Sequence, residues 1–515
     1  MKKTAFVLTL ILLTYALLSS CNKEPAEIPQ RTAVSVDAVA SEIDRVMAQD
    51  GPSYTVMSVD FNPKDYGRII PNMVAFTEDM WEKEKDTALY SFITLDGDII
   101  CGPLFDYVSY SENAGAYIVR RTENGVSKYG FLSSNGAVFT GLIFDGAAEA
   151  LNTDDDELCF FGTNYENGKL YVSPVDIDLE VLMATPVTID ESELGITAEN
   201  AQLSVLYMND KSAMMINRSE FYYKTFLVDI SSGKVLYMNK NFGSKTCKIF
   251  GNVFVEQDIH GKGITVYGMD GSVLVDDPNA YSGRLSNETY MVCREGVLNV
   301  YDYNWNVVDS MSVSPETEVM TSFGKIAVVS SNYTNVYDKD LKLINTLDYA
   351  VTGGTYLRDW YGYGAGDFLY DSISGTREII NLTTGAKLPK EEGFYYEFKN
   401  SYIIADNESN GNDPVKKYRI YDKEFKEIIS GEGTADVLAD EINGDIYLIT
   451  NKDGIYSVYS LPSLELKFNL KASCFSLNPV AGRFYGYDRD NFIYVDGNGK
   501  DLLCYKIDYK KANGV

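Results

Sequence analysis

Two stretches near the start of the chain repeat one pattern of residues. "YSFITLDGDIICGPLFDYV" begins at Tyr90 and "YGFLSSNGAVFTGLIFDGA" begins at Tyr129. In each stretch aromatic residues alternate with small or polar ones, then an Asp-Gly or Asn-Gly pair follows, and a Phe-Asp pair ends the unit. Period-two alternation is typical of a strand with one buried face, and Asp-Gly and Asn-Gly are strong signals of a tight hairpin turn. The repeat therefore predicts strands and hairpins.

Further along, an aliphatic-Tyr strand, a short turn and an aliphatic return strand recur at intervals of about 40 residues. The examples are "VYGMDGSVL" at Val266, "VYDYNWNVV" at Val300, "VYDKDLKLI" at Val336, "IYDKEFKEI" at Ile420 and "VYSLPSLEL" at Val458, with "FLVDISSGKVL" at Phe226, "IINLTTGAKL" at Ile379 and "IYVDGNGKDLL" at Ile493 between them. A weaker version starts at Leu170, which brings the count with the two early units to eleven hairpins.

The spacing leaves room for two more strands before each hairpin. "EVMTSFG" and "KIAVVSSN" precede the hairpin at Val336, and "FYYEFKN" and "SYIIADN" precede that at Ile420. Four short antiparallel strands in about forty residues make a β-propeller blade, and a ring of blades protects sheet edges. We predict an all-β propeller; an open stack of similar sheets is the alternative.

The early units resemble the WG repeat of bacterial proteins, in which an aromatic-Gly pair precedes an Asp/Asn-Gly turn and an aromatic-Asp pair follows. Tyr129-Gly130, Asn135-Gly136 and Phe144-Asp145 carry the resemblance, whereas Ser91 replaces the glycine in the first unit. The resemblance spans about residues 85–150 and implies no particular chemistry. We expect about three WG-like blades over 53–190 and about eight propeller blades over 200–512, as one or two rings.

The N-terminus has the features of a targeting signal. Lys2 and Lys3 precede an apolar run from Ala5 to Leu18 that is short for a membrane span, and "LSSC" ends at Cys21. This ending resembles the lipobox of bacterial lipoproteins, which implies that residues 1–21 are a signal peptide and that Cys21 is acylated. An ordinary secretory signal is the alternative. Asn22 after the cysteine favours the outer membrane, on its periplasmic or its cell-surface face.

Residues 22–52 are predicted to form a tether and one short helix. The tether contains Pro25 and Pro29, and in "SVDAVASEIDRVMAQDG" the apolar residues fall on one helical face, with Ser35 as a cap and Gly51 as the end. A net charge of −29 argues against binding nucleic acid, whose phosphates such a surface repels. Anchoring would therefore use the lipid on Cys21 instead of a basic patch.

Signals for catalysis are sparse. The only histidine is His260, so a Ser-His-Asp or Cys-His site would have to use it, and zinc held by several imidazoles is excluded. Six scattered cysteines besides Cys21 form no CxxC and are expected to be buried small hydrophobes. We predict no cofactor and no metal, although a glycosidase-like carboxylate pair stays open among 74 acidic residues.

Three acidic loops invite a calcium hypothesis, namely Thr153–Glu157, Asp406–Asp413 and Asp496–Asp501. Calcium needs six or more oxygen ligands, and each loop is also a plausible solvated turn, which we favour. The most site-like stretch is "YLRDWYGYGAGD", where Trp360, Tyr361 and Tyr363 alternate with glycines and Arg358 and Asp359 offer polar contacts. Such aromatics either stack on sugars or peptide side chains, or simply pack between blades.

The sequence thus favours a non-catalytic, lipid-anchored envelope protein that binds a protein or glycan ligand, as a scaffold or receptor. The alternatives are a glycan-active envelope enzyme with paired carboxylates and a structural component of an outer-membrane assembly. The predicted ligand-binding residues are Arg358, Asp359, Trp360, Tyr361 and Tyr363.

Overall fold

The computed structural model describes most of residues 63–511. Outside the described part lie 1–62, 512–515 and internal stretches, the longest of which are 79–87, 150–157, 180–186, 191–202, 357–368 and 408–414. Within the described residues every regular element is a strand, which confirms the all-β prediction. The predicted helix within 35–51 falls outside this part.

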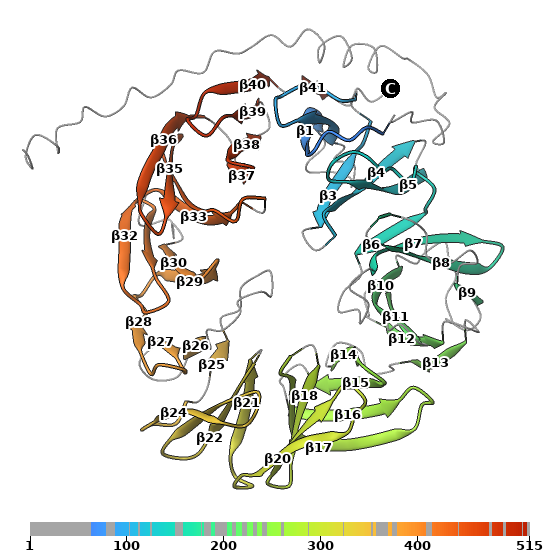
Figure 1. Ribbon diagram of the computed structural model, residues 1–515, viewed down its shortest axis with the longest axis vertical. Helices are drawn as coiled ribbons and strands as arrows, with labels where there is room; N and C mark the ends of the chain where they lie inside the picture. Colours follow the sequence, from blue (N-terminus) through green and yellow to red (C-terminus); the bar gives the residue numbers. More distant parts are fainter. Residues whose placement is uncertain are drawn as a thin grey trace, which may run out of the picture. The chain divides into compact units, whose positions relative to one another are not determined.

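The strands assemble into sheets in chain order (Figure 1). The first part of the chain contributes β1 (Ile69–Glu78), β2 (Ala88–Thr94), a sheet of β3 (Tyr107–Ser111), β4 (Ala116–Glu123) and β5 (Val126–Ser133), a sheet of β6 (Gly146–Glu149), β7 (Leu158–Glu166), β8 (Lys169–Asp176) and β9 (Val187–Asp190), and a sheet of β10 (Leu203–Met208), β11 (Ala213–Arg218), β12 (Lys224–Asp229) and β13 (Val235–Met238).

The next sheet has seven strands, because one long strand serves two four-stranded units. Its strands are β14 (Lys245–Phe250), β15 (Val253–Asp258), β16 (Lys262–Gly268), β17 (Val273–Arg284), β18 (Thr289–Arg294), β19 (Val297–Asp302) and β20 (Val307–Ser312). Tyr281 of β17 pairs with Lys262 of β16 on one side and with Cys293 of β18 on the other. The end of one unit is therefore also the start of the next.

Five further four-stranded antiparallel sheets complete the series. They consist of β21 (Glu318–Ser322), β22 (Lys325–Val329), β23 (Thr334–Asp338) and β24 (Leu343–Leu347); β25 (Gly354–Tyr356), β26 (Leu369–Ser372), β27 (Glu378–Asn381) and β28 (Lys387–Pro389); β29 (Phe394–Lys399), β30 (Tyr402–Asn407), β31 (Lys417–Tyr421) and β32 (Glu427–Glu432); β33 (Thr434–Ala439), β34 (Ile446–Lys452), β35 (Ile455–Leu461) and β36 (Glu465–Lys471); and β37 (Asn478–Val480), β38 (Arg483–Tyr487), β39 (Asn491–Val495) and β40 (Asp501–Lys506).

The eight hairpins predicted from Phe226 onward are the third and fourth strands of these units, as the pairings of β12 with β13 and of β39 with β40 illustrate. The predicted partner strands also exist, for example β21 and β22 before β23. For the weaker hairpin at Leu170, the first strand is β8, which pairs with β9 from Val187, while most of the expected return segment "IDLEVL" lies outside the described residues.

The described strands divide into two compact units. One holds β33 to β40, and the other holds β1 to β30 together with β41 (Asp508–Lys511). In the second unit β41 pairs in parallel with β1, so that Ala75 lies opposite Asp508 and Glu78 opposite Lys511. The last described strand is therefore hydrogen-bonded to the first.

Apolar side chains of several sheets pack against those of the following sheet. Leu285 and Met291 share a buried cluster with Ile326 and Val328 of the next sheet. Ile379 and Leu388 likewise pack against the cluster around Phe398, Ile403 and Ala405. Because alternate residues of a strand point to opposite faces, a sheet between two such neighbours can bury both its faces.

The two WG-like units form one regular strand each, and their return segments touch it only at isolated bridges. Tyr90 bridges Phe105, and Tyr129 bridges Phe144. The predicted return strands at Ile99 and Val138 are therefore irregular segments rather than strands. The reason lies at Gly130, where a Cβ would stand 2.3 Å from the carbonyl oxygen of Gly141, so the return segment passes directly over the glycine.

The serine that replaces this glycine in the first unit adapts to the same close approach. The hydroxyl of Ser91, which is buried, donates a hydrogen bond to the carbonyl of Cys101. The return segment therefore contacts the side chain of Ser91 in the first unit and the backbone of Gly130 in the second. This explains how the departure from the aromatic-Gly pattern is tolerated.

The Phe-Asp pairs tie each WG-like unit to the next sheet. The backbone N–H of Asp106 donates to the carbonyl of Arg120 at 2.9 Å, and its carboxylate accepts from the N–H of Thr122 and from Arg120 Nε at 2.8 Å. Asp145 repeats this arrangement. Its N–H donates to the carbonyl of Thr163 at 2.8 Å, and its Oδ2 accepts from the N–H of Tyr165 at 2.8 Å.

Candidate binding surface

An aspartate at the end of the third strand organises four of the hairpin turns. These aspartates are Asp302, Asp338, Asp422 and Asp496. In each turn the Oδ1 atom accepts the backbone N–H groups of the second and fourth residues that follow, at 2.7–3.0 Å. Such side-chain acceptors fix a turn by taking up amides that the strands leave unpaired.

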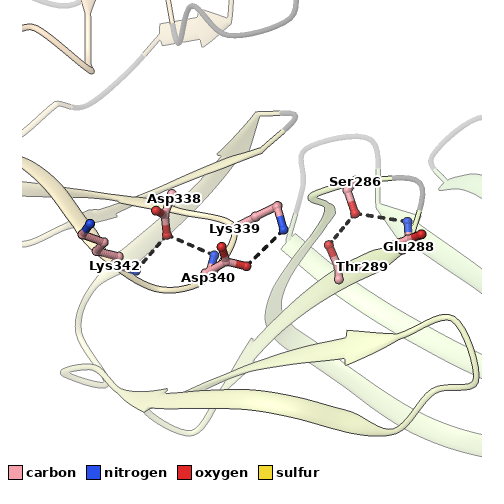
Figure 2. Close-up of polar contacts among 7 residues, drawn as sticks. All are labelled: Ser286, Glu288, Thr289, Asp338, Lys339, Asp340 and Lys342. Atoms are coloured by element: carbon pink, nitrogen blue, oxygen red, sulfur yellow. Dashed lines mark hydrogen bonds and ion pairs between the residues drawn. The ribbon is translucent and has the colours of Figure 1, made fainter.

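Figure 2 shows one of these turns beside the loop of the preceding sheet. Asp338 Oδ1 accepts from the N–H groups of Asp340 and Lys342, and Lys339 Nζ lies 3.1 Å from Asp340 Oδ1. In the neighbouring loop the Ser286 hydroxyl lies 2.7 Å from Thr289 Oγ1 and accepts the N–H of Glu288. Both loops are therefore held by their own side chains, with Lys339 and Asp340 exposed at the tip.

The third residue after each aspartate has a positive φ. It is Trp305, Leu341, Phe425 or Gly499, with φ between 55° and 78°. Three of them are large side chains in a region that usually favours glycine. They are retained because they pack on neighbours. Trp305, for example, stacks on Tyr301 with 4.3 Å between ring centroids and contacts Phe250 across 6.5 Å.

Polar side chains and largely buried aromatic rings surround Arg419 on β31. Arg419 Nη1 lies 2.7 Å from Glu391 Oε1, and Nη2 donates to Glu391 Oε2 at 3.0 Å, which makes a two-point ion pair. Glu427 Oε2 lies 3.8 Å from the same Nη1 atom. The side chains of Arg419 and Glu391 remain 35% and 47% exposed. We call Arg419, Glu391, Glu427, Phe394, Tyr396 and Tyr421 the Arg419 cluster.

Aromatic residues hold this ion pair in place. The guanidinium lies 5.6 Å from the centroid of the Phe394 ring. A hydrogen bond to the Tyr421 hydroxyl, together with the nearby Glu391 and Glu427 carboxylates, raises the pKa of Arg419. The Tyr396 hydroxyl accepts the backbone N–H of Glu391 at 3.0 Å. Glu391 is thus held both through its side chain, by Arg419, and through its backbone N–H, by Tyr396.

A smaller group of the same type lies in the preceding sheet. Lys387 Nζ sits 3.7 Å from the centroid of the Tyr349 ring and 3.5 Å from Glu378 Oε2. Lys390 Nζ, in the segment before β29, lies 5.6 Å from the centroid of the Tyr396 ring. Cations over aromatic faces therefore recur along this part of the chain.

The predicted site residues fall mostly outside the described part. Cys21, His260, Thr153–Glu157 and the ligand-binding residues Arg358, Asp359, Trp360, Tyr361 and Tyr363 all lie there. Of the acidic stretch starting at Asp406, only Asp406 and Asn407 are described, at the end of β30. Asp496 is described, and its Oδ1 is occupied by the amides of Asn498 and Lys500 in a hairpin turn.

Sequence reasoning missed the Arg419 cluster and the aspartate turns. The turns had a visible signal, because Tyr-Asp ends the third strand at 301–302, 337–338 and 421–422. The Arg419 cluster had none, since Glu391 and Arg419 are far apart in the sequence. Among the described residues, no three or more His, Cys, Asp or Glu side chains gather to hold a metal ion, and no helix is long and apolar enough to cross a membrane.

Neither a family model nor a curated protein matches this chain. Similar solved structures include BamB from Moraxella catarrhalis, with 11% identity, a TM-score of 0.29 and coverage of 61% of this chain and 96% of BamB. Another is AztD from Citrobacter koseri, with 12% identity, a TM-score of 0.26 and coverage of 59% and 97%. The dihydro-heme d1 dehydrogenase NirN has 13% identity, a TM-score of 0.29 and coverage of 81% and 82%. With TM-scores this low, the proposals below depend on the residues of this chain alone.

Proposed function

We propose that this chain is a non-catalytic, lipid-anchored β-propeller of the bacterial cell envelope that binds a protein or glycan ligand as a scaffold or receptor. The observation that carries the binding role is the Arg419 cluster, where an exposed two-point ion pair is held rigidly by aromatic side chains. A fixed polar group beside partly exposed aromatic side chains is suited to ligand recognition.

The propeller is supported by the succession of four-stranded antiparallel units and by the pairing of β41 with β1. A ring of such units leaves only short, protected edges. We assign about three blades to 53–190 and about eight to 200–512, the seven-stranded sheet counting as two blades that share β17.

The anchor is proposed from the lipobox-like ending at Cys21, and it would place the protein on the outer membrane, facing either the periplasm or the cell surface. The stretch Tyr356–Asp367 lies between β25 and β26 in the sequence, and its residues Arg358, Asp359, Trp360, Tyr361 and Tyr363 stay a separate proposal for ligand binding.

The non-catalytic assignment is supported by the structural use of carboxylates in the described part. Asp106, Asp145 and Asp302 each accept backbone amides of turns or strands, so their lone pairs serve the fold. A general acid or base needs a carboxyl group that faces a reacting atom. The carboxylates of these three residues bind backbone amides instead.

The full chain, purified in detergent, tests this function in two parallel assays. Binding to a glycan array and capture of cross-linked envelope proteins should give a stable complex with one ligand class, without any release of reducing sugar from the glycans. Turnover of a polysaccharide that a single carboxylate substitution abolishes would refute the non-catalytic role and favour the glycan-active enzyme.

A further inference from the structure

We propose that the Arg419 cluster is a subsite for a glycan, and that it recognises two adjacent hydroxyl groups on one sugar ring. This inference rests on the proposed binding function and names its ligand class. It is carried by the geometry of the Arg419–Glu391 pair and by the aromatic side chains around it.

The ion pair leaves hydrogen-bonding capacity on both partners. Arg419 carries five N–H donors, of which two point to Glu391. The Glu391 carboxylate has about four acceptor positions and gives two of them to Arg419. A donor group and an acceptor group therefore lie side by side on an exposed edge. A hydroxyl can both donate and accept, so neighbouring hydroxyls fit this edge: one donates to Glu391 while the other accepts from Arg419.

The contribution of an exposed ion pair to the stability of the fold does not explain why so many side chains surround this one. Exposed ion pairs contribute about 0–1 kcal/mol, because water screens them and both side chains lose freedom. The exposed pair between Lys452 Nζ and Glu432 Oε2, at 2.5 Å, shows the simpler form that such a contact usually takes. Around Arg419, three aromatic residues and a second carboxylate are added. Preorganisation of this kind lowers the entropy that a ligand must lose on binding.

The aromatic side chains supply the apolar part of the surface. Phe394 and Tyr396 are half-buried and lie on the same side of β29, because they are two residues apart in a strand. Both rings pack on the buried cluster around Phe398 and carry the cations of Arg419 and Lys390 over them, so a sugar would contact their exposed edges through its C–H groups while its hydroxyl edge reaches the ion pair. The two interactions together define an orientation for the sugar.

Other ligand classes fit less well. Glu391 and Glu427 flank the guanidinium, so an anionic ligand would meet two like charges next to its one partner. A protein partner needs an apolar core at its interface. The large exposed aromatic side chain nearest in sequence, Tyr395, lies on the opposite side of β29 from Phe394 and Tyr396. A neutral glycan matches the charges and the apolar area that this side presents.

Affinity electrophoresis of the full chain in native gels tests the proposal with dextran, mannan, xylan and laminarin as probes. The first three polysaccharides carry adjacent free hydroxyls along the chain, whereas the β-1,3 linkage of laminarin removes them from its internal residues. We expect at least one of the first three to slow migration and laminarin to have no effect. Periodate oxidation, which cleaves adjacent diols, should abolish the retardation.

Two variants test the site itself. Arg419→Ala and Glu391→Gln should each raise the apparent dissociation constant at least tenfold, with the thermal midpoint within 2 °C of the parent chain, about what an exposed pair would change. Lys452→Ala, which breaks the simpler exposed pair, is the matched control and should bind like the parent chain. Glu391→Gln keeps the shape of the side chain, so it still tests the site if the Arg419→Ala variant misfolds.

The outcomes separate the two levels of the proposal. Retardation that survives both variants would overturn the assignment of the Arg419 cluster and leave the proposed binding function standing. Binding to laminarin as strong as to dextran would overturn the recognition of adjacent hydroxyls. If none of the polysaccharides slows the chain, the glycan class is refuted, and capture of an envelope protein would then carry the binding function alone.

Discussion

Asp440 Oδ2 accepts the backbone N–H of Gly482 at 2.6 Å, although the two residues belong to the first turns of successive sheets. Its Oδ1 atom accepts the N–H of Ala481 at 2.9 Å and of Ile442 at 3.0 Å. Asp440 is fully buried, and both Ala481 and Gly482 have positive φ, which turns their amides toward one point. One carboxylate thus joins two sheets through their backbones.

Asp440→Ala should lower the free energy of unfolding by about 3 kcal/mol, because several buried amides lose their acceptor. Urea denaturation monitored by tyrosine fluorescence measures the change. Asp340→Ala, at an exposed turn tip, is the control and should change stability by less than about 0.5 kcal/mol. Equal effects of the two substitutions would contradict the role given to Asp440.

Trp305 combines backbone strain with favourable packing, and two substitutions separate these contributions. Trp305→Ala should lower the free energy of unfolding by about 3 kcal/mol, since the contacts with Tyr301 and Phe250 are lost while φ stays at 63°. Trp305→Gly loses the same contacts but relieves the strain, so it should be less destabilising by about 1 kcal/mol. Chemical denaturation of both variants measures the difference. A glycine variant that is less stable than the alanine variant would show that the backbone at residue 305 is not strained.

Gly130→Ala should destabilise the WG-like region by about 2 kcal/mol, because the added Cβ would collide with the carbonyl of Gly141. Ser91→Ala at the corresponding position loses one hydrogen bond and introduces no clash, so it should cost about 1 kcal/mol. Thermal unfolding compares the two. If Gly130→Ala proves as stable as the parent chain, the return segment does not cross as closely as its backbone indicates.

Strand identity could be predicted from the sequence because it depends on local signals. The alternation around Tyr337 and the turn at Asp338 are contained within one hairpin, and the structure has β23 and β24 there. The return segment after Tyr129 could not be foreseen as irregular, since its course depends on Gly130 and Gly141 meeting across the unit. The Arg419 cluster was missed for a related reason. Glu391 and Arg419 become neighbours only when the segment before β29 packs beside β31.

Cys21→Ala should abolish incorporation of labelled palmitate and move the protein from the membrane to the soluble fraction of the envelope. The lipid is the proposed anchor, and each buried CH₂ contributes about 0.8 kcal/mol to membrane binding. Metabolic labelling followed by fractionation measures both effects. Cys101→Ala is the matched control and should leave labelling unchanged. Persistent labelling of Cys21→Ala would disprove acylation at this residue.

Tyr290 makes the stability of the fold sensitive to alkaline pH. Burial raises the pKa of its hydroxyl to about 12, whereas the unfolded chain has the ordinary value of about 10. Below pH 10 the hydroxyl is protonated in both states, and its contribution to stability is fully present. Between pH 10 and 12 the unfolded state loses the proton first, so the free energy of unfolding should fall by about 1.4 kcal/mol per pH unit through this residue.

Urea denaturation of the parent chain and of Tyr290→Phe at pH 9 and pH 11 isolates the contribution of this hydroxyl. The variant should lose less stability over this range than the parent, while Tyr333→Phe, at an exposed position, should behave like the parent. Identical losses of unfolding free energy in the parent chain and in Tyr290→Phe would show that the buried hydroxyl does not cause the loss of stability at alkaline pH.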